Sequence, residues 1–343
     1  MTIHTLDPKT IPIRTMLVAA SAFVLCAGAA VADSLVVYSP QGGDRAVWIA
    51  QQAQAAGHDI AILNAGGGEL FDRLIAEKNN PQADVVFGLV DTSMALLKRE
   101  GLFQAYVPSW ADELPDQYRD ADGMVHKFWQ TPIVLAYNAD ALSEADAPQG
   151  WLDLTDPAYR GKYVIGNLAW QTTRVYLAGI LVRFLDERGE VAAEGWDFMR
   201  DLYAHAIVVN DGSAKAQAFQ SGDAVIDLNW FGGAFRQASQ LGYTVELVDT
   251  DGGTPFISEG IAIMAGTDQR AEAKAFVDWF GSPAFMGAYA EQFGQAPVHP
   301  AALALSPDSV QEDAALVSPQ AIDWDTVATK LDAWLQTIEL EIR

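Results

Sequence analysis

The chain has 343 residues, of which 50% are hydrophobic and 19% are charged, and its formal net charge at pH 7 is −24. A chain this acidic offers no basic face that would displace the counterions of a nucleic acid or bind anionic lipid, so we expect neither as a partner. Its length favours two packed lobes over one.

Residues 1–32 are typical of a cleavable export signal. Lys9 and Arg14 supply positive charge, residues 15–30 are almost wholly apolar or small, and Ala30-Val31-Ala32 is a small-x-small cleavage sequence. We predict cleavage after Ala32 and a periplasmic location in a Gram-negative cell. The single cysteine, Cys26, lies inside this leader, so the mature chain would have no disulfide and no thiolate metal site.

Short apolar strands alternate with helical stretches along the rest of the chain, which predicts mostly parallel sheets covered by helices. In the first part of the chain we expect strands at 34–38, 60–63 and 84–87, with helices at about 44–55, 70–78 and 92–100. After residue 160 we expect strands at 163–165, 207–210 and 224–228, with helices at about 172–187 and 195–205.

Three glycines at 66–68 come directly after the second predicted strand. They carry no Cβ, so a solute could approach the bare backbone there, and the helix that follows gathers free N–H groups at its start. Asn79-Asn80-Pro81 ends that helix, because proline disfavours helical geometry in the residue before it. The unit predicts a binding site at a helix N-terminus, and a glycine-rich connection without a ligand is the alternative.

Two long extended stretches, 128–138 and 255–264, lie on either side of an intervening α/β region. Each is long enough to leave one lobe and enter another. Two such crossings between α/β lobes define a hinged clamshell whose cleft holds a small solute. We expect lobe 1 to comprise residues 33–132 and 258–300, lobe 2 residues 133–257, and C-terminal helices at 301–343 that pack across the lobes.

Five segments, in order, resemble the periplasmic solute-binding proteins of ABC importers. They are GELFDRLIAEKNNPQADVVFG at 68–88, DLTDPAYRGK at 153–162, AEAKAFVDWF at 271–280 followed by Ser282-Pro283, FGQAPV at 293–298, and residues 322–334. The chain looks most like the branch that includes ferric-iron, thiamine, polyamine and aminoethylphosphonate binders.

This resemblance implies a type II, two-lobed α/β clamshell with two crossover strands as its hinge. It also implies a monomeric binder that is not an enzyme, needs no cofactor, is not embedded in the membrane, and delivers a small solute to an ABC permease with its ATPase. Two other functions stay open: a binder that feeds a sensor kinase or chemoreceptor, and an exported enzyme on the same frame.

The resemblance places ligand contacts on cleft-facing loops and on the crossing strands. The expected ligand-binding residues are Ser39, Gln41, Gly67, Gly68, Asp91, Gln130, Thr131, Trp170, Thr173, Arg174, Asn229, Trp230 and Glu259. Several of these residues have simpler explanations. Trp170 could cover the hydrophobic core, Thr173 could be a helix N-cap, and Arg174 could pair with a surface acid. Asp91 and Glu259 could each be a solvated carboxylate.

The chemistry of the solute stays open at this stage. Ferric binding in this branch depends on adjacent tyrosines, and the matching position here reads Trp230-Phe231, which offers no oxygen. Iron would therefore need other ligands, and the dispersed histidines do not have metal-site spacing. An aromatic cleft with carboxylates suits an organic cation such as thiamine or a polyamine, Arg174 with glycine-turn amides suits an anion, and an aminophosphonate would use both.

Overall fold

The computed structural model describes residues 34–343, which form one compact unit. The predicted export signal and its cleavage site lie outside the described residues. Among residues 34–343, no helix is both long enough and apolar enough to cross a membrane.

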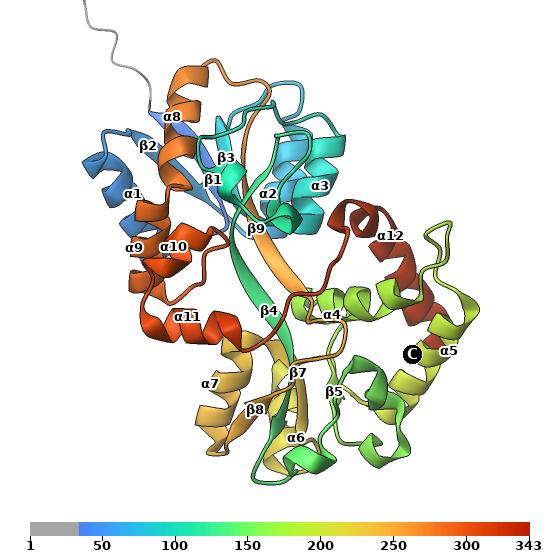
Figure 1. Ribbon diagram of the computed structural model, residues 1–343. Coiled ribbons are helices and arrows are strands. Elements are labelled where there is room, and N and C mark those ends of the chain that lie inside the picture. Colours follow the sequence, from blue (N-terminus) through green and yellow to red (C-terminus); the bar gives the residue numbers. More distant parts are fainter. Residues whose placement is uncertain (1–33) are drawn as a thin grey trace, which may run out of the picture. The chain divides into compact units, whose positions relative to one another are not determined.

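A seven-stranded sheet has the order β2-β1-β3-β9-β4-β7, with β8 paired to β4 (Figure 1). Its strands are β1 (Leu35–Ser39), β2 (Ile60–Asn64), β3 (Val85–Val90), β4 (His126–Asn138), β7 (Ile226–Trp230), β8 (Val245–Leu247) and β9 (Phe256–Ile263). A second sheet pairs β5 (Val164–Ile165) with β6 (Ile207–Val208). The pairs β1–β2, β1–β3 and β5–β6 are parallel, and every pair that includes β4 or β9 is antiparallel. The sheet is therefore mixed, because the two long strands run against their neighbours.

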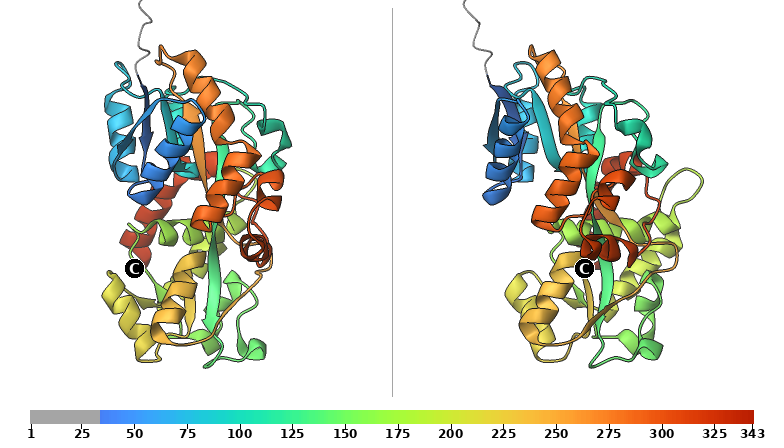
Figure 2. Two further views of the ribbon diagram at one scale, coloured as in Figure 1. Left: turned by 90° about the vertical axis from the view of Figure 1, so that its left-hand side faces the viewer. Right: turned by 60° about the vertical axis from the view of Figure 1, so that its left-hand side comes forward.

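The helices flank these strands. They are α1 (Asp44–Ala55), α2 (Gly67–Ala76), α3 (Asp91–Arg99), α4 (Gln171–Leu181), α5 (Ala193–His205), α6 (Gly212–Gln220), α7 (Phe231–Leu241), α8 (Arg270–Phe280), α9 (Pro283–Phe293), α10 (Pro300–Ala304), α11 (Asp308–Ala315) and α12 (Trp324–Thr337). Figure 2 shows α8 and α9, in orange, on one group of strands and α7, in gold, on the other.

The two crossing strands lie side by side and change partners along their length (Figure 1). In β4, residues 126–132 pair with β9, whereas residues 133–137 pair with β7. Strand β4 therefore begins in one lobe and ends in the other, as the long extended stretch at 128–138 predicts. The residue boundaries proposed for the lobes stay a prediction.

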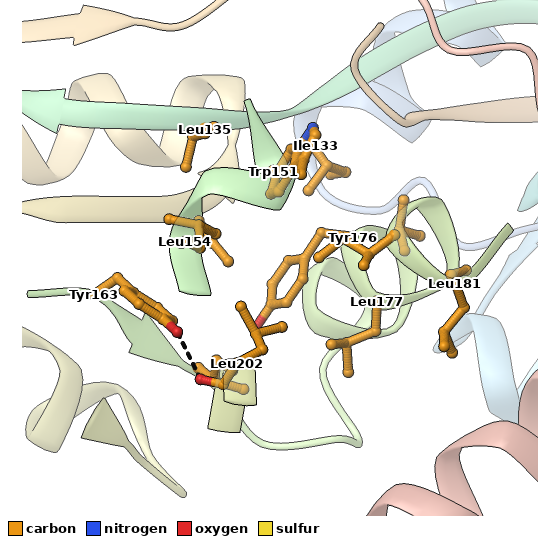
Figure 3. Packing of buried hydrophobic residues seen from close by; sticks show 14 of the residues in the cluster. Ile133, Leu135, Trp151, Leu154, Tyr163, Tyr176, Leu177, Leu181 and Leu202 are labelled. Atoms are coloured by element: carbon orange, nitrogen blue, oxygen red, sulfur yellow. Dashed lines mark hydrogen bonds between the residues drawn. The ribbon is translucent and has the colours of Figure 1, made fainter. Parts of the chain in front are cut away.

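Each lobe has its own hydrophobic core. In the first lobe, buried residues of β1, β3, α8 and α9 pack around Phe87, Phe128 and Phe280. In the second lobe, Trp151, Tyr163 and Tyr176 pack with residues of β4, α5 and α12, and the Tyr163 hydroxyl donates to the Leu202 carbonyl at 2.6 Å (Figure 3). Burying aromatic side chains in two separate clusters stabilises each lobe on its own while leaving β4 and β9 as the links between them.

The C-terminal helix α12 belongs to the core of the second lobe but also contacts the first. Trp324, Leu331 and Trp334 are buried in the second core. At the start of the same helix, Asp325 pairs with Lys98 of α3 at 3.0 Å. The helix thus joins the lobes on the side of α3, in addition to the two crossing strands.

Candidate functional site

A cavity of about 480 Å³, called here the cleft cavity, lies where β4 and β9 pass between the lobes. The first lobe contributes Arg45 from α1, Gln130 and Thr131 from β4, Glu259 from β9, and the residues Phe293–Ala296 that end α9 and follow it. The second lobe contributes Trp230, Phe231 and Phe256, and α11 adds Asp313. Both lobes therefore line one cavity.

Four polar side chains on the first lobe form a connected set, called here the polar chain. Gln41 Nε2 donates to Glu259 Oε2 at 2.8 Å, and Arg45 Nη1 donates to Gln41 Oε1 and to Gln295 Oε1, both at 3.1 Å. Within residues 34–343, no carboxylate oxygen lies within 4 Å of the Arg45 guanidinium. The guanidinium instead lies 5.4 Å from the centre of the Phe293 ring. Its charge is thus available to an acidic ligand group.

The turn between β1 and α1 sets the position of the polar chain. The Ser39 hydroxyl accepts from the Gln41 backbone N–H at 3.1 Å, and Gly43 takes a φ of 58°, in the left-handed region that favours glycine. A Cβ on Gly42 would lie 2.7 Å from Asn64 Oδ1. Ser39 itself is fully buried, so it supports the turn, and Gln41 holds Glu259 and Arg45 without lining the cleft cavity itself.

Glu259 has unusual surroundings for a carboxyl group. Burial raises its pKa to about 7, against the opposing effects of Trp129, Gln41 and Arg45, while the charge of Asp91 raises it further. No Lys or Arg nitrogen of the described chain lies within 4 Å of it. A carboxyl group with a pKa of about 7 exists in both protonation states near neutral pH, so a charged ligand group beside it would shift the proportion of the two states.

Asp91, the other predicted carboxylate, lies outside the cleft cavity. It pairs with Lys127 at 2.8 Å and accepts from the backbone N–H of Ser258 at 2.7 Å. Burial raises its pKa too, with Lys127 and the Ser258 N–H acting against that rise. Its bonds tie α3 to both crossing strands, which is a structural task.

Three other predicted residues gather around Trp230. A second cavity of about 390 Å³ is lined by Trp170, Thr173, Asn229 and Trp230, so Trp230 borders both cavities. Its side chain is 38% exposed, and the Arg236 guanidinium carbon lies 4.7 Å from the centre of its ring. Thr173 is buried inside α4 and is not its N-cap, which is Trp170.

Gly68 and Arg174 line a smaller cavity of about 210 Å³ between α2 and α4, and Gly67 lies in the first turn of α2. The Arg174 guanidinium pairs with Asp332 of α12. The structure therefore gives Arg174 an acidic partner and does not place it with the polar chain. The glycine turn and Arg174 were expected to bind an anion together, but the pairing with Asp332 neutralises much of the Arg174 charge.

Several residues that line the cleft cavity were not expected from the sequence, namely Arg45, Phe256, Phe293, Gln295 and Asp313. Phe293 and Gln295 belong to a segment that carries the family resemblance, which could have marked them. Arg45 gives no local signal, because its partner Gln295 lies 250 positions further along the chain.

The described residues contain no group of three or more His, Cys, Asp or Glu side chains that could hold a metal ion. Trp230 and Phe231 stand where adjacent tyrosines were expected for ferric iron, and their side chains supply no oxygen ligand.

Comparison with known proteins identifies the family. The model of the bacterial extracellular solute-binding protein family matches residues 48–318. The chain belongs to this family. The solute-binding protein is 67% identical over 324 residues to a probable ABC transporter periplasmic-binding protein of Sinorhizobium fredii, covering 94% of this chain and 90% of the relative. The expected family is thereby confirmed.

Two further matches extend this result. A gamma-aminobutyric acid-binding protein of Pseudomonas aeruginosa is 26% identical over 309 residues, which is 83% of each chain. The solved structure of apo FutA2 from Synechocystis superposes with a TM-score of 0.75 at 20% identity, covering 89% of this chain and 98% of that one. The predicted type II clamshell is confirmed, and the solute-binding protein is the periplasmic component of an ABC transporter with a small-molecule ligand and a permease as partners.

Proposed function

We propose that this solute-binding protein captures a small zwitterion, with an ammonium group and a carboxylate or phosphonate, in the cleft cavity. The observation that carries the proposal is the polar chain. It holds an arginine without an acidic partner and a carboxyl without a basic partner on either side of Gln41. One cavity thus offers a site for each ligand charge.

The chemistry of these groups fits the two ends of such a ligand. A guanidinium donates two parallel hydrogen bonds to a carboxylate or phosphonate, and Arg45 uses only Nη1 within the polar chain. Glu259 would accept from the ammonium. Trp230, Phe231 and Phe256 would cover the hydrocarbon between the charges when the lobes close, since closure is stabilised by contacts made only in the closed state.

The gamma-aminobutyric acid-binding relative supports this ligand class, because the ligand in its name carries an amine at one end and a carboxylate at the other. An organic cation such as thiamine or putrescine is the second candidate, favoured by the exposed Trp230 ring beside Glu259. The unpaired Arg45 charge opposes it.

A thermal-shift panel with matched analogues tests the proposal. It compares γ-aminobutyrate and 2-aminoethylphosphonate with butyrate and butylamine, which each keep one charge, and with putrescine, thiamine and ferric citrate. A ligand at 100 times its Kd adds about 2.7 kcal/mol to the free energy of unfolding, which raises the Tm by several degrees. We expect a large shift only with a zwitterion. An equal shift with butylamine, or a shift with ferric citrate alone, would contradict the proposal.

A further inference from the structure

Two carboxyl groups, the buried Asp91 and the partly buried Glu259, lie near each other at the hinge, and their partners differ. Asp91 has Lys127 at 2.8 Å and the Ser258 N–H at 2.7 Å. Glu259, the next residue after Ser258, accepts from the neutral Gln41 amide at 2.8 Å, and the neutral Trp129 side chain also acts to lower its pKa. The difference matters because a close cation favours the charged form of a carboxylate more strongly than a neutral amide does.

The groups that face Glu259 come from several elements. Arg45 of α1 lies beyond ion-pair distance, and Asp91 of α3 is already paired. Tyr289 of α9 is buried, and burial raises the pKa of its hydroxyl, as does the charge of Glu259, so this group is neutral. Asp313 of α11 lines the same cavity. None of these groups gives Glu259 the close positive charge that an ionised carboxylate needs in a partly buried site.

The adjacent strands add no charge at this point. On β4 the residue in register with Glu259 is Trp129, and on β3 it is Val90. The balance of burial against these neighbours raises the pKa of Glu259 to about 7. In the ligand-free protein the carboxyl is therefore protonated in a large share of molecules near neutral pH.

We infer that capture of the solute is coupled to the release of one proton, because the ammonium group of the solute takes the place of the proton on Glu259. The inference rests on the proposed function, since it needs a cationic group next to this carboxyl. In the step, the Glu259 O–H bond breaks and the proton passes to the buffer. The carboxylate then accepts a hydrogen bond from the ammonium, and the ligand's acidic group pairs with Arg45.

The coupling predicts how affinity depends on pH. With a ligand-free pKa of about 7, binding releases about nine-tenths of a proton at pH 6 and about one-tenth at pH 8. Affinity therefore rises with pH, by about tenfold per unit below pH 6, and levels off above pH 8.

Isothermal titration with γ-aminobutyrate tests this directly. The groups of this probe resemble Glu and Lys side chains, with pKa values of about 4.3 and 10.4, so the probe itself does not titrate between pH 6 and 8. Comparing buffers with different ionisation enthalpies gives the number of protons released. We expect the release described above for the wild type and for the control Glu272→Gln, an exposed position on α8. In Glu259→Gln we expect weaker binding, no release and an affinity independent of pH.

Several outcomes would overturn the inference. Binding of γ-aminobutyrate without proton release, or with the same release in Glu259→Gln, contradicts the coupling but leaves the proposed function standing. If γ-aminobutyrate, β-alanine and 5-aminovalerate all fail to bind, the proposed function and the coupling fall together. Where Glu259→Gln binds too weakly to titrate, infrared difference spectra of the wild type decide. Adding the probe must remove a protonated carboxyl band, and an unchanged band contradicts the inference.

Discussion

The two sides of the cleft cavity differ in how their side chains are held. On the first lobe, Gln41, Arg45, Gln295 and Glu259 are fixed to one another by hydrogen bonds. On the second lobe, Trp230, Phe231 and Phe256 offer aromatic surface. A fixed polar set distinguishes ligands by charge and spacing, whereas an aromatic surface accepts many ligands of similar size. We therefore expect the first lobe to set specificity and the second to add contact area on closure.

The largest effect is expected from Arg45→Gln. Removing a charged hydrogen bond to a ligand acid costs about 1.5–3 kcal/mol, or roughly 10- to 150-fold in Kd. Titration calorimetry with γ-aminobutyrate measures the loss. The control is Arg99→Gln at the exposed end of α3, which should bind like the wild type. If both variants bind γ-aminobutyrate equally well, Arg45 does not bind the acidic group of the ligand.

The second effect concerns the stability of the ligand-free protein. Because the folded pKa of Glu259, about 7, lies above the reference value of 4.5, the folded state binds more protons between these pH values. The free energy of unfolding contributed by this group therefore falls as pH rises from 4.5 to 7, by on the order of 2 kcal/mol.

Urea unfolding of the wild type and Glu259→Gln across this pH range checks the sign. The variant should lack this contribution, so that it gains stability relative to the wild type as pH rises. Parallel stability curves for the two proteins would show that Glu259 titrates normally in the folded state.

A smaller effect is expected from Trp230→Ala. An aromatic face next to an ammonium contributes about 0.5–2 kcal/mol, so the variant should weaken binding by roughly 3- to 30-fold. Trp230→Phe keeps an aromatic face and should retain most of the affinity. If alanine binds as tightly as phenylalanine at this position, the second lobe contributes no aromatic contact through Trp230.

The smallest effect is expected from Arg174→Gln. The Arg174 charge is paired with Asp332, which is 81% exposed as a side chain, and partly exposed ion pairs contribute about 0–1 kcal/mol. The affinity for γ-aminobutyrate should stay within about threefold of the wild type. A loss of affinity as large as that of Arg45→Gln would show that Arg174 binds the acidic group of the ligand.

Local sequence patterns predicted much of the fold. The apolar runs placed the ends of β1, β2 and β3 within three residues, and α2 begins at Gly67, inside the glycine run and three residues before the expected start at 70. The two long extended stretches became β4 and β9, which cross between the lobes. Strand β8 was missed because it has only three residues and none of them is buried.

The candidate site was predictable only in part. Trp230 was expected to face a ligand because it follows an apolar strand, and it does line the cleft cavity. The pairing of Gln41 with Glu259 spans 218 positions, and that of Arg174 with Asp332 spans 158. Such contacts are set by how the lobes and α12 pack, so no local pattern could have separated the free arginine from the paired one.

The most direct test of the account is a cycle of four affinities: wild type and Arg45→Gln, each with γ-aminobutyrate and with butylamine, which lacks the carboxylate. If Arg45 binds the carboxylate of the ligand, the substitution weakens γ-aminobutyrate binding at least about tenfold and leaves butylamine binding nearly unchanged. An equal loss for both ligands would contradict a cleft that recognises a zwitterion through its polar chain.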